Sequence, residues 1–238
     1  MVTTRLYRDG TLIEKDFPVA RISDLIAEEG VTLWADFVSP TAEDLAAIEE
    51  ELSLHKLAVE DAVHDYQRPK LDRYDSHLFF AAYSVSLDSN TGVLATNEVK
   101  AFITPRALVT IHPPEFDMSL VTAHWDNDGD LAKHGVAFLL WGLLDTIVDG
   151  HFATVQELDG EIELLEDALF DETPRSSEVQ KRSFELRKSL VRFRRVVLPM
   201  REVLNTLLRR DLHVIDEDMS HYFQDVYDHV LRVSESTD

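Results

Sequence analysis

The chain has 238 residues, of which 45% are hydrophobic, and it contains no cysteine. Its 45 acidic residues outnumber 23 basic ones, and the resulting charge of −22 argues against nucleic acid as a partner and favours cations or basic partners. Without thiolates, a metal must be held by carboxylate, carbonyl or water oxygens or by imidazole nitrogen, which favours hard ions. No secretory signal opens the chain, and its longest apolar run, residues 135–144, is shorter than the roughly 20 residues of a membrane helix, so we expect the chain as given to be soluble.

The first 114 residues combine strand and helix signals. Asp9-Gly10 predicts a hairpin turn between two β-prone segments, and Gly30 ends a short helix over 20–28. Ser39-Pro40 predicts the cap and first residue of a helix that runs to Leu54. The remaining predicted elements are strands over 31–37, 78–87, 93–104 and 107–112, and a helix over 57–64. A central sheet covered by helices, in an α/β or α+β domain, follows from this mixture.

The second half of the chain predicts helices. After a short helix to Trp125, a helical pattern runs over about 131–171 and ends at Thr173-Pro174. The next helix runs over about 176–210, with a kink at Pro199. Two long helices joined by a short turn predict an antiparallel hairpin. We therefore divide the chain into a layered domain (1–130), a helical hairpin (131–212) and a final helix (213–238).

Charge is segregated along the hairpin. Residues 145–172 hold ten acidic residues and no Lys or Arg, whereas residues 175–210 hold eleven basic residues and three acidic ones. The two helices are thus complementary in charge. Each exposed contact between them is worth under about 1 kcal/mol, so most of these charges solubilise and align the pair.

The final helix carries one apolar stripe that is still running when the sequence ends. Its members lie three, four and seven residues apart: Met219, Tyr222, Phe223, Val226, Val230 and Val233. No helix stop signal follows, so we expect the helix to continue beyond this sequence. On another face, Asp225 lies four residues from both His221 and His229, with Asp228 beside them. These groups can share a divalent cation, although solvation alone explains such a face more often.

Two other pairs of carboxylates are candidate cation ligands. Glu60 and Asp61 are adjacent in a short helix and offer oxygen ligands to a hydrated ion. Asp145 and Asp149 are four apart in an apolar helix, where they cost free energy unless they are paired or metal-bound. A salt bridge to the basic helix explains this second pair equally well. The chain has no Gly-rich phosphate loop, G-x-S-x-G or H-E-x-x-H motif, so we expect no enzyme activity.

Three blocks of sequence resemble a known family. His-Lys-Leu-Ala-Val-Glu-Asp-Ala at 55–62 and Gln-Arg-Pro-Lys at 67–70 resemble the H-P-L-x-x-E-D…Q-R-P-K block in the cytosolic domain of CorA-type magnesium transporters. Leu-Pro-Met-Arg-Glu-Val-Leu at 198–204 resembles x-P-L-R-E-V-L of that family, and Tyr-Phe-Gln-Asp-Val-Tyr-Asp-His at 222–229 resembles Y-F-R-D-V-Y-D-H. With the intervening sequence, the resemblance extends from about residue 31 to the end.

The resemblance implies an α/β/α domain with a mixed sheet, followed by a long antiparallel helical hairpin and the start of a stalk helix. In this family the stalk leads into membrane helices, which are absent here, and the full protein is a homopentamer whose cytosolic domains lie at the cytoplasmic face of the cell (inner) membrane. Divalent cations bound between subunits favour the closed pore. This chain is then expected to be a soluble cytosolic fragment that senses Mg²⁺, or alternatively Co²⁺, Ni²⁺ or Zn²⁺.

The resemblance also implies which residues bind the cations. Asp61 of one subunit and Asp225 on the stalk of the next are the implied bridging ligands, and Glu60 and Asp145 match an adjacent site. We add Asp149 and His229 as further candidates. Two departures from the pattern bear on these sites, because Lys56 replaces a proline near the first pair and Gln224 replaces an arginine before the stalk aspartate.

Three other functions compete with this interpretation. A zinc-transporting branch shares the architecture. A soluble acidic interaction module is the second alternative, in which the basic face of residues 181–201 docks an acidic partner. A carboxylate-metal hydrolase acting through Asp145 and Asp149 is the third, and the missing catalytic motifs argue against it.

Overall fold

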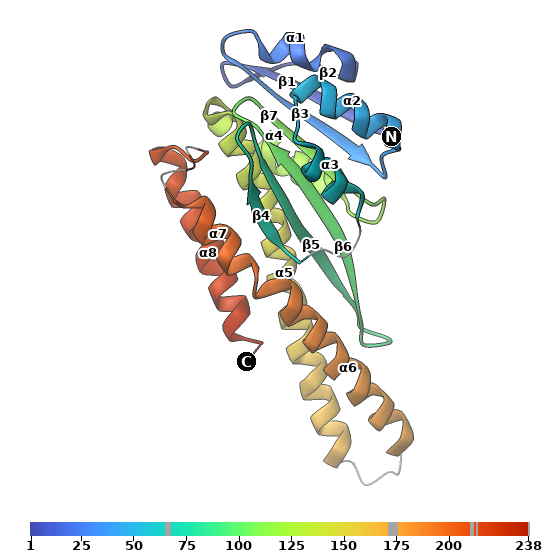
Figure 1. Ribbon diagram of the computed structural model, residues 1–238. Helices are drawn as coiled ribbons and strands as arrows, with labels where there is room; N and C mark the ends of the chain where they lie inside the picture. The colour runs from blue at the N-terminus through green and yellow to red at the C-terminus, as the bar shows by residue number, and fades with distance from the viewer. Residues whose placement is uncertain (65–67, 171–175, 210–211, 213, 238) are drawn as a thin grey trace.

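A seven-stranded mixed sheet with helices on both faces forms the body of the molecule, and a pair of helices extends from it (Figure 1). The structure, a computed structural model, describes residues 1–64, 68–170, 176–209, 212 and 214–237. The strands lie in the order β2-β1-β3-β7-β6-β5-β4, and β3 and β7 are the parallel pair among antiparallel neighbours. They are β1 (Val2–Arg8), β2 (Thr11–Lys15), β3 (Val31–Val38), β4 (Lys70–Arg73), β5 (Leu78–Asp88), β6 (Val93–Ile103) and β7 (Ala107–His112).

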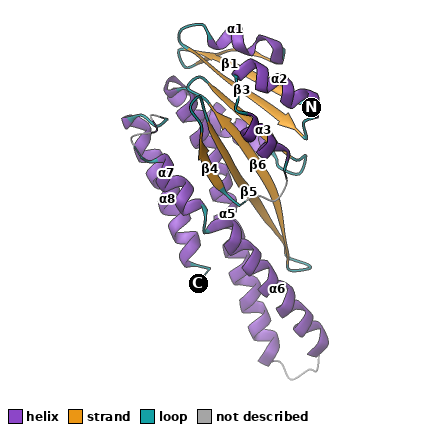
Figure 2. Ribbon diagram, in the orientation of Figure 1, coloured by secondary structure: helices purple, strands orange, loops and turns teal. Residues whose placement is uncertain are grey.

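Both faces of the sheet are buried, which explains why the central strands are apolar at nearly every position. Along β3, Leu33 and Phe37 pack with the helices on one face, while Trp34 packs with those on the other. Figure 2 shows the helices on either side of the strands. The three layers confirm the predicted α/β/α domain with a mixed sheet.

One layer consists of α1 (Ile22–Ile26), α2 (Ala42–Leu52) and α3 (Lys56–Val63), preceded by the short 3-10 helix η1 (Val19–Arg21). The predicted cap of α2 at Ser39-Pro40 is wrong, because the helix begins after Thr41. The hydroxyl of Thr41 accepts from the backbone N–H of Asp44, and the Asp44 carboxylate accepts from the N–H of Thr41. This reciprocal pair satisfies two free donors, so it outweighs the proline signal.

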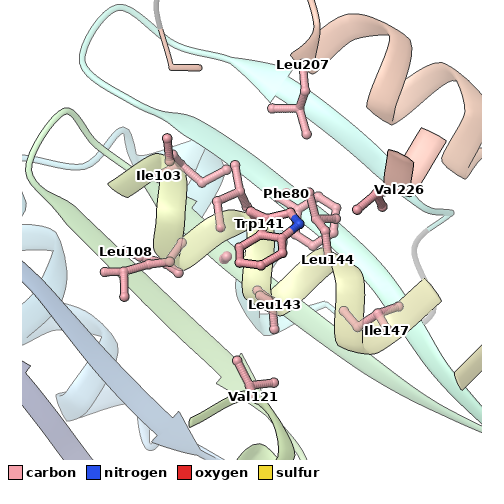
Figure 3. Close-up of a cluster of buried hydrophobic side chains, with 14 of the residues drawn as sticks. Phe80, Ile103, Leu108, Val121, Trp141, Leu143, Leu144, Ile147, Leu207 and Val226 are labelled. Atoms are coloured by element: carbon pink, nitrogen blue, oxygen red, sulfur yellow. The ribbon is translucent and has the colours of Figure 1, made fainter. Parts of the chain in front are cut away.

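The other layer consists of α4 (Met118–Asn127), α5 (Val136–Phe170), α7 (Met200–Leu207) and α8 (Glu217–Glu235). Trp141 and Leu144 of α5 lie among Phe80 of the sheet and Val226 of α8 (Figure 3). The start of α5 predicted at residue 131 is wrong by five residues. A 3-10 helix, η2 (Gly129–His134), comes first, and Gly135 separates the two helices with a φ of 61°.

The end of α5 and helix α6 (Ser176–Val197) project from the sheet side by side (Figure 1). Their predicted turn at Thr173-Pro174 lies outside the described residues. Arg182 of α6 forms an ion pair with Glu161 of α5, in line with the charge complementarity of the two helices. The break between α6 and α7 includes Pro199, as predicted. The division of the chain at residues 130 and 212 stays a prediction.

Helix α8 buries the stripe that the sequence predicts, except at one position. Met219, Phe223, Val226, Val230 and Val233 are buried, whereas Tyr222 is 38% exposed and touches Trp141 with one edge. Helix α5 is long and apolar enough to span a membrane by length and composition, but 67% of its most apolar window is buried inside the fold. Packing against the sheet and α8 accounts for that apolar surface.

Candidate metal-binding site

Helices α5 and α8 bring together acidic and histidine side chains from positions 80 residues apart. Asp145 and Asp149 share a face of α5 because they are four residues apart, and His229 reaches them from α8. One ligand atom from each of these three residues lies within 4.8 Å of the other two. The imidazole of His229 stands between two carboxylates, with Nδ1 3.8 Å from Asp149 and Nε2 3.9 Å from Asp225.

A second histidine faces the same cluster from α4. His124 Nδ1 lies 3.6 Å from the carboxylate of Asp145, and its ring packs edge-on against Trp141. Among the described residues, the ion-pair contacts of Asp145 and Asp149 are thus with histidines and not with the basic helix α6. The alternative of a salt bridge to that helix is therefore wrong. Sequence spacing gave no signal for His124, because α4 reaches α5 only through tertiary packing.

Burial and like charge make Asp145 costly to ionise. Its side chain is 16% exposed, while that of Asp149 is 64% exposed. Burial raises the pKa of Asp145, the negative charges of Asp149 and Asp225 raise it further, and the two histidines lower it in part. A divalent cation would neutralise this repulsion, and the donors present, carboxylate oxygens and imidazole nitrogens, fit such an ion.

The other predicted carboxylates lie on α3, in the opposite helical layer. Asp61 accepts a hydrogen bond from Lys70 Nζ at 2.5 Å, and the same ammonium group lies 2.6 Å from Asp72. Burial would lower the pKa of Lys70, but its hydrogen bonds to the two carboxylates outweigh burial and raise it. Glu60 and Lys56 are both exposed. The lysine that neutralises Asp61 is therefore Lys70, from the Gln-Arg-Pro-Lys block.

One chain thus divides the six predicted ligands into two groups. Asp145, Asp149, His229 and Asp225 lie together at the junction of α5 and α8, whereas Glu60 and Asp61 lie across the sheet from them. Asp228 accepts a hydrogen bond from Gln224 at 3.1 Å, and His221 is exposed on the same helix. The implied pairings of Asp61 with Asp225, and of Glu60 with Asp145, therefore require a second copy of the chain.

The layered fold, with its projecting helix pair, is shared with a solved domain of a metal-ion transporter. The solved soluble domain of CorA from Methanocaldococcus jannaschii superposes with a TM-score of 0.76 at 19% identity, covering 98% of this chain and 90% of that one. The family model described as "CorA-like Mg2+ transporter protein" matches residues 29–238, and the chain belongs to this family. This confirms the family inferred from the three sequence blocks.

Two relatives extend the match over nearly the whole chain. YfjQ of Bacillus subtilis is 30% identical over 223 residues, which are 93% of this chain and 67% of the relative. The cobalt/magnesium transport protein CorA of Thermotoga maritima is 27% identical over 256 residues, covering 100% of this chain and 71% of the relative. Each relative is longer than the present sequence.

Proposed function

We propose that this chain is the cytoplasmic regulatory domain of a divalent-cation transporter, in which bound Mg²⁺ favours the closed pore. The observation that carries the proposal is the cluster of Asp145, Asp149 and His229, where a partly buried carboxylate faces like charge without a Lys or Arg partner among the described residues. The family of the chain, CorA-like Mg²⁺ transporters, supports a role in transport rather than in catalysis.

The cluster suits a hydrated ion better than a dehydrated one. Mg²⁺ keeps several of its waters and binds through one or two carboxylates, so donors that are spread over 4.8 Å can reach it directly or through water. The imidazole of His229 adds a nitrogen ligand, which Co²⁺, Ni²⁺ and Zn²⁺ accept more readily than Mg²⁺ does. We therefore expect Mg²⁺ as the physiological ion and the softer ions as tighter ligands of the isolated domain.

The regulatory step needs two neighbouring copies in a homopentamer. The side chains of Asp61 and Asp225 are 34% and 67% exposed, so both are accessible to another chain. Carboxylates from two copies repel each other until a cation bridges them, and the high negative charge of each chain adds to this repulsion. A fall in Mg²⁺ would then release the contact between subunits and favour the open state.

Light scattering tests this proposal directly. Millimolar Mg²⁺ should raise the solution mass of the domain, and a chelator should reverse the change. Asp61→Asn and Asp225→Asn should each remove the response. Asp159→Asn, at an exposed position of α5 outside the cluster, removes the same charge and should keep it. A mass that is insensitive to Mg²⁺, or equal losses in all three variants, would contradict the proposal.

A further inference from the structure

A groove lined by arginines lies beside α6, on a surface to which the cation site gives no role. It has a volume of about 860 Å³, within the range of small-molecule sites. Among the eleven described residues that line it, four are arginines and none is acidic. The arginines are Arg68, Arg192, Arg194 and Arg195. In a chain with nearly twice as many acidic as basic residues, such a lining is a local reversal of charge.

The arginines converge from segments far apart in the sequence. Arg192 and Arg195 are three residues apart on one exposed face of α6, and Arg68 joins them from the segment before β4. Tyr83 and Thr96 of the sheet also line the groove. Two of the sequence blocks singled out above meet here, because Pro69 belongs to one and Leu198-Pro199 to the other.

We propose that this groove binds a small oligophosphate anion. A guanidinium group presents paired N–H donors that match two phosphate oxygens, and a concave site lined by one sign of charge concentrates counter-ions. A single phosphate group carries a charge of about −1.5 to −2, which cannot neutralise the three arginines Arg68, Arg192 and Arg195. A chain of two or three phosphates can, and the groove is large enough to hold it.

The site is independent of the proposed cation cluster. The groove is lined by α6, the segment before β4 and strands β5 and β6, whereas the cluster lies between α5 and α8. Inorganic triphosphate is therefore the probe, in metal-free buffer with a chelator, so that cation binding plays no part in the result. Titration calorimetry should show one saturable site, and the melting temperature should rise with triphosphate concentration.

Two double variants, one inside the groove and one outside it, each remove two positive charges from α6. Arg192→Gln with Arg195→Gln should weaken triphosphate binding by about tenfold or more, since charge-assisted hydrogen bonds are roughly twice as strong as neutral ones. Arg187→Gln with Lys188→Gln, outside the groove on the same helix, should change the affinity by less than about twofold. Arg68→Gln tests the second segment separately, and circular dichroism checks that each variant is folded.

Adenosine triphosphate and vesicles containing phosphatidylglycerol distinguish the sources of phosphate. Groove-dependent binding of the nucleotide with an affinity close to that of triphosphate would support recognition through the phosphates. The proposal is overturned if triphosphate gives no saturable heat, if the groove variant binds like the wild type, or if the control variant loses as much affinity. Binding confined to vesicles would overturn it as well.

Discussion

Carboxylates in the completed ion pairs and in the α5–α8 cluster are neutralised in different ways. Asp61 on α3 has the ammonium group of Lys70 at 2.5 Å, and Asp36 in β3 has the imidazole of His112 at 3.0 Å. Asp145 on α5 faces the more distant His124, at 3.6 Å, and His229, together with further acidic groups. The first two are ion pairs completed by the chain itself. Under the proposed function, the α5–α8 cluster is the one that a cation from solution would complete.

This contrast has consequences for folding as well as for binding. Removing one member of a buried ion pair destabilises the fold, because the other member keeps its charge and loses its partner. A cluster of carboxylates without a cation destabilises the fold, because burial and the repulsion between like charges both oppose ionisation of the carboxylates. Substitutions should therefore have effects of opposite sign on stability: losses at the completed pairs and, without metal, a gain at the cluster.

The largest effect is expected where α8 docks on the core. Phe223→Ala removes a fully buried ring and should lower the free energy of unfolding by about 3–5 kcal/mol, measured by urea denaturation. It should also abolish any Mg²⁺ response, since His229 and Asp225 depend on the same helix. Tyr222→Ala, at the neighbouring and partly exposed ring, should cost less than half as much. Equal costs would mean that α8 is not held by its buried stripe.

Breaking the buried pair of Asp36 and His112 comes next. Burial alone would lower the pKa of His112, but the hydrogen bond and charge of Asp36 outweigh burial and raise it. Because the pKa of His112 is higher in the folded chain than its unfolded value of about 6.5, the pair stabilises the fold fully below pH 6.5. This stabilisation is lost as the pH rises through the pKa of His112 in the folded chain. His112→Gln should therefore cost about 3 kcal/mol near pH 6 and less near pH 9.

His151 provides the control for that pH dependence. It is fully buried and bonded through Nε2 to the backbone carbonyl of Tyr83, and burial lowers its pKa to about 4. In the folded chain the imidazole therefore stays neutral between about pH 6 and pH 9, whereas in the unfolded chain it titrates near pH 6.5. His151→Gln should therefore cost less near pH 6 than near pH 9, the opposite direction to His112→Gln, because only the unfolded imidazole gains a proton in this range. A cost that is larger near pH 6 would remove the reason for assigning the His112 effect to its charge.

Asp145→Asn separates the cluster from the completed pairs. Without metal, it should raise the melting temperature by about 2–4 °C, the shift given by about 1 kcal/mol in a chain of this size, because it removes a partly buried charge that faces other acidic groups. With millimolar Mg²⁺, the wild type should gain stability and the variant should not. Asp159→Asn should respond to Mg²⁺ like the wild type. A variant that is destabilised in chelator would contradict the idea of an incomplete site.

The sequence predicted the fold better than the site. Periodicity located the α8 stripe, and β-branched runs located β5 to β7, because both signals are local. Strand β4 was missed, since Lys70–Arg73 is a short, polar edge strand without an apolar run. At α2 the sequence carries two competing start signals, Ser39-Pro40 and the capping box of Thr41 and Asp44, and the capping box is the one that the structure uses.

Tertiary packing decided the composition of the site. Spacing paired Asp145 with Asp149, and the resemblance suggested Asp225, but only the docking of α8 on α5 brings His229 to them. Lys70 belongs to a sequence motif that predicts no contact for it, because the antiparallel pairing that places β4 beside β5 leaves no signal in the segment itself. Contacts made across a sheet or between distant helices have no counterpart in local patterns.

The smallest expected effect tests whether Lys70 limits cation binding at α3. The side chains of Lys70 and Asp61 are 27% and 34% exposed, so Lys70→Gln should cost under about 1 kcal/mol in urea denaturation. The substitution also removes the ammonium group that neutralises Asp61 within the chain. If Asp61 contributes to a site between subunits, the variant should need less Mg²⁺ for half-maximal association in light scattering.

Lys56→Gln is the matched control for that experiment, because it removes one exposed positive charge from the start of the same helix. Lys56→Gln changes the electrostatic potential near α3 but leaves the hydrogen bond between Lys70 and Asp61 in place. A larger shift for Lys70→Gln than for Lys56→Gln would show that Asp61 exchanges its lysine for a cation on assembly. Equal shifts would assign the effect to net charge, and the α5–α8 cluster would then be the place where the chain responds to Mg²⁺.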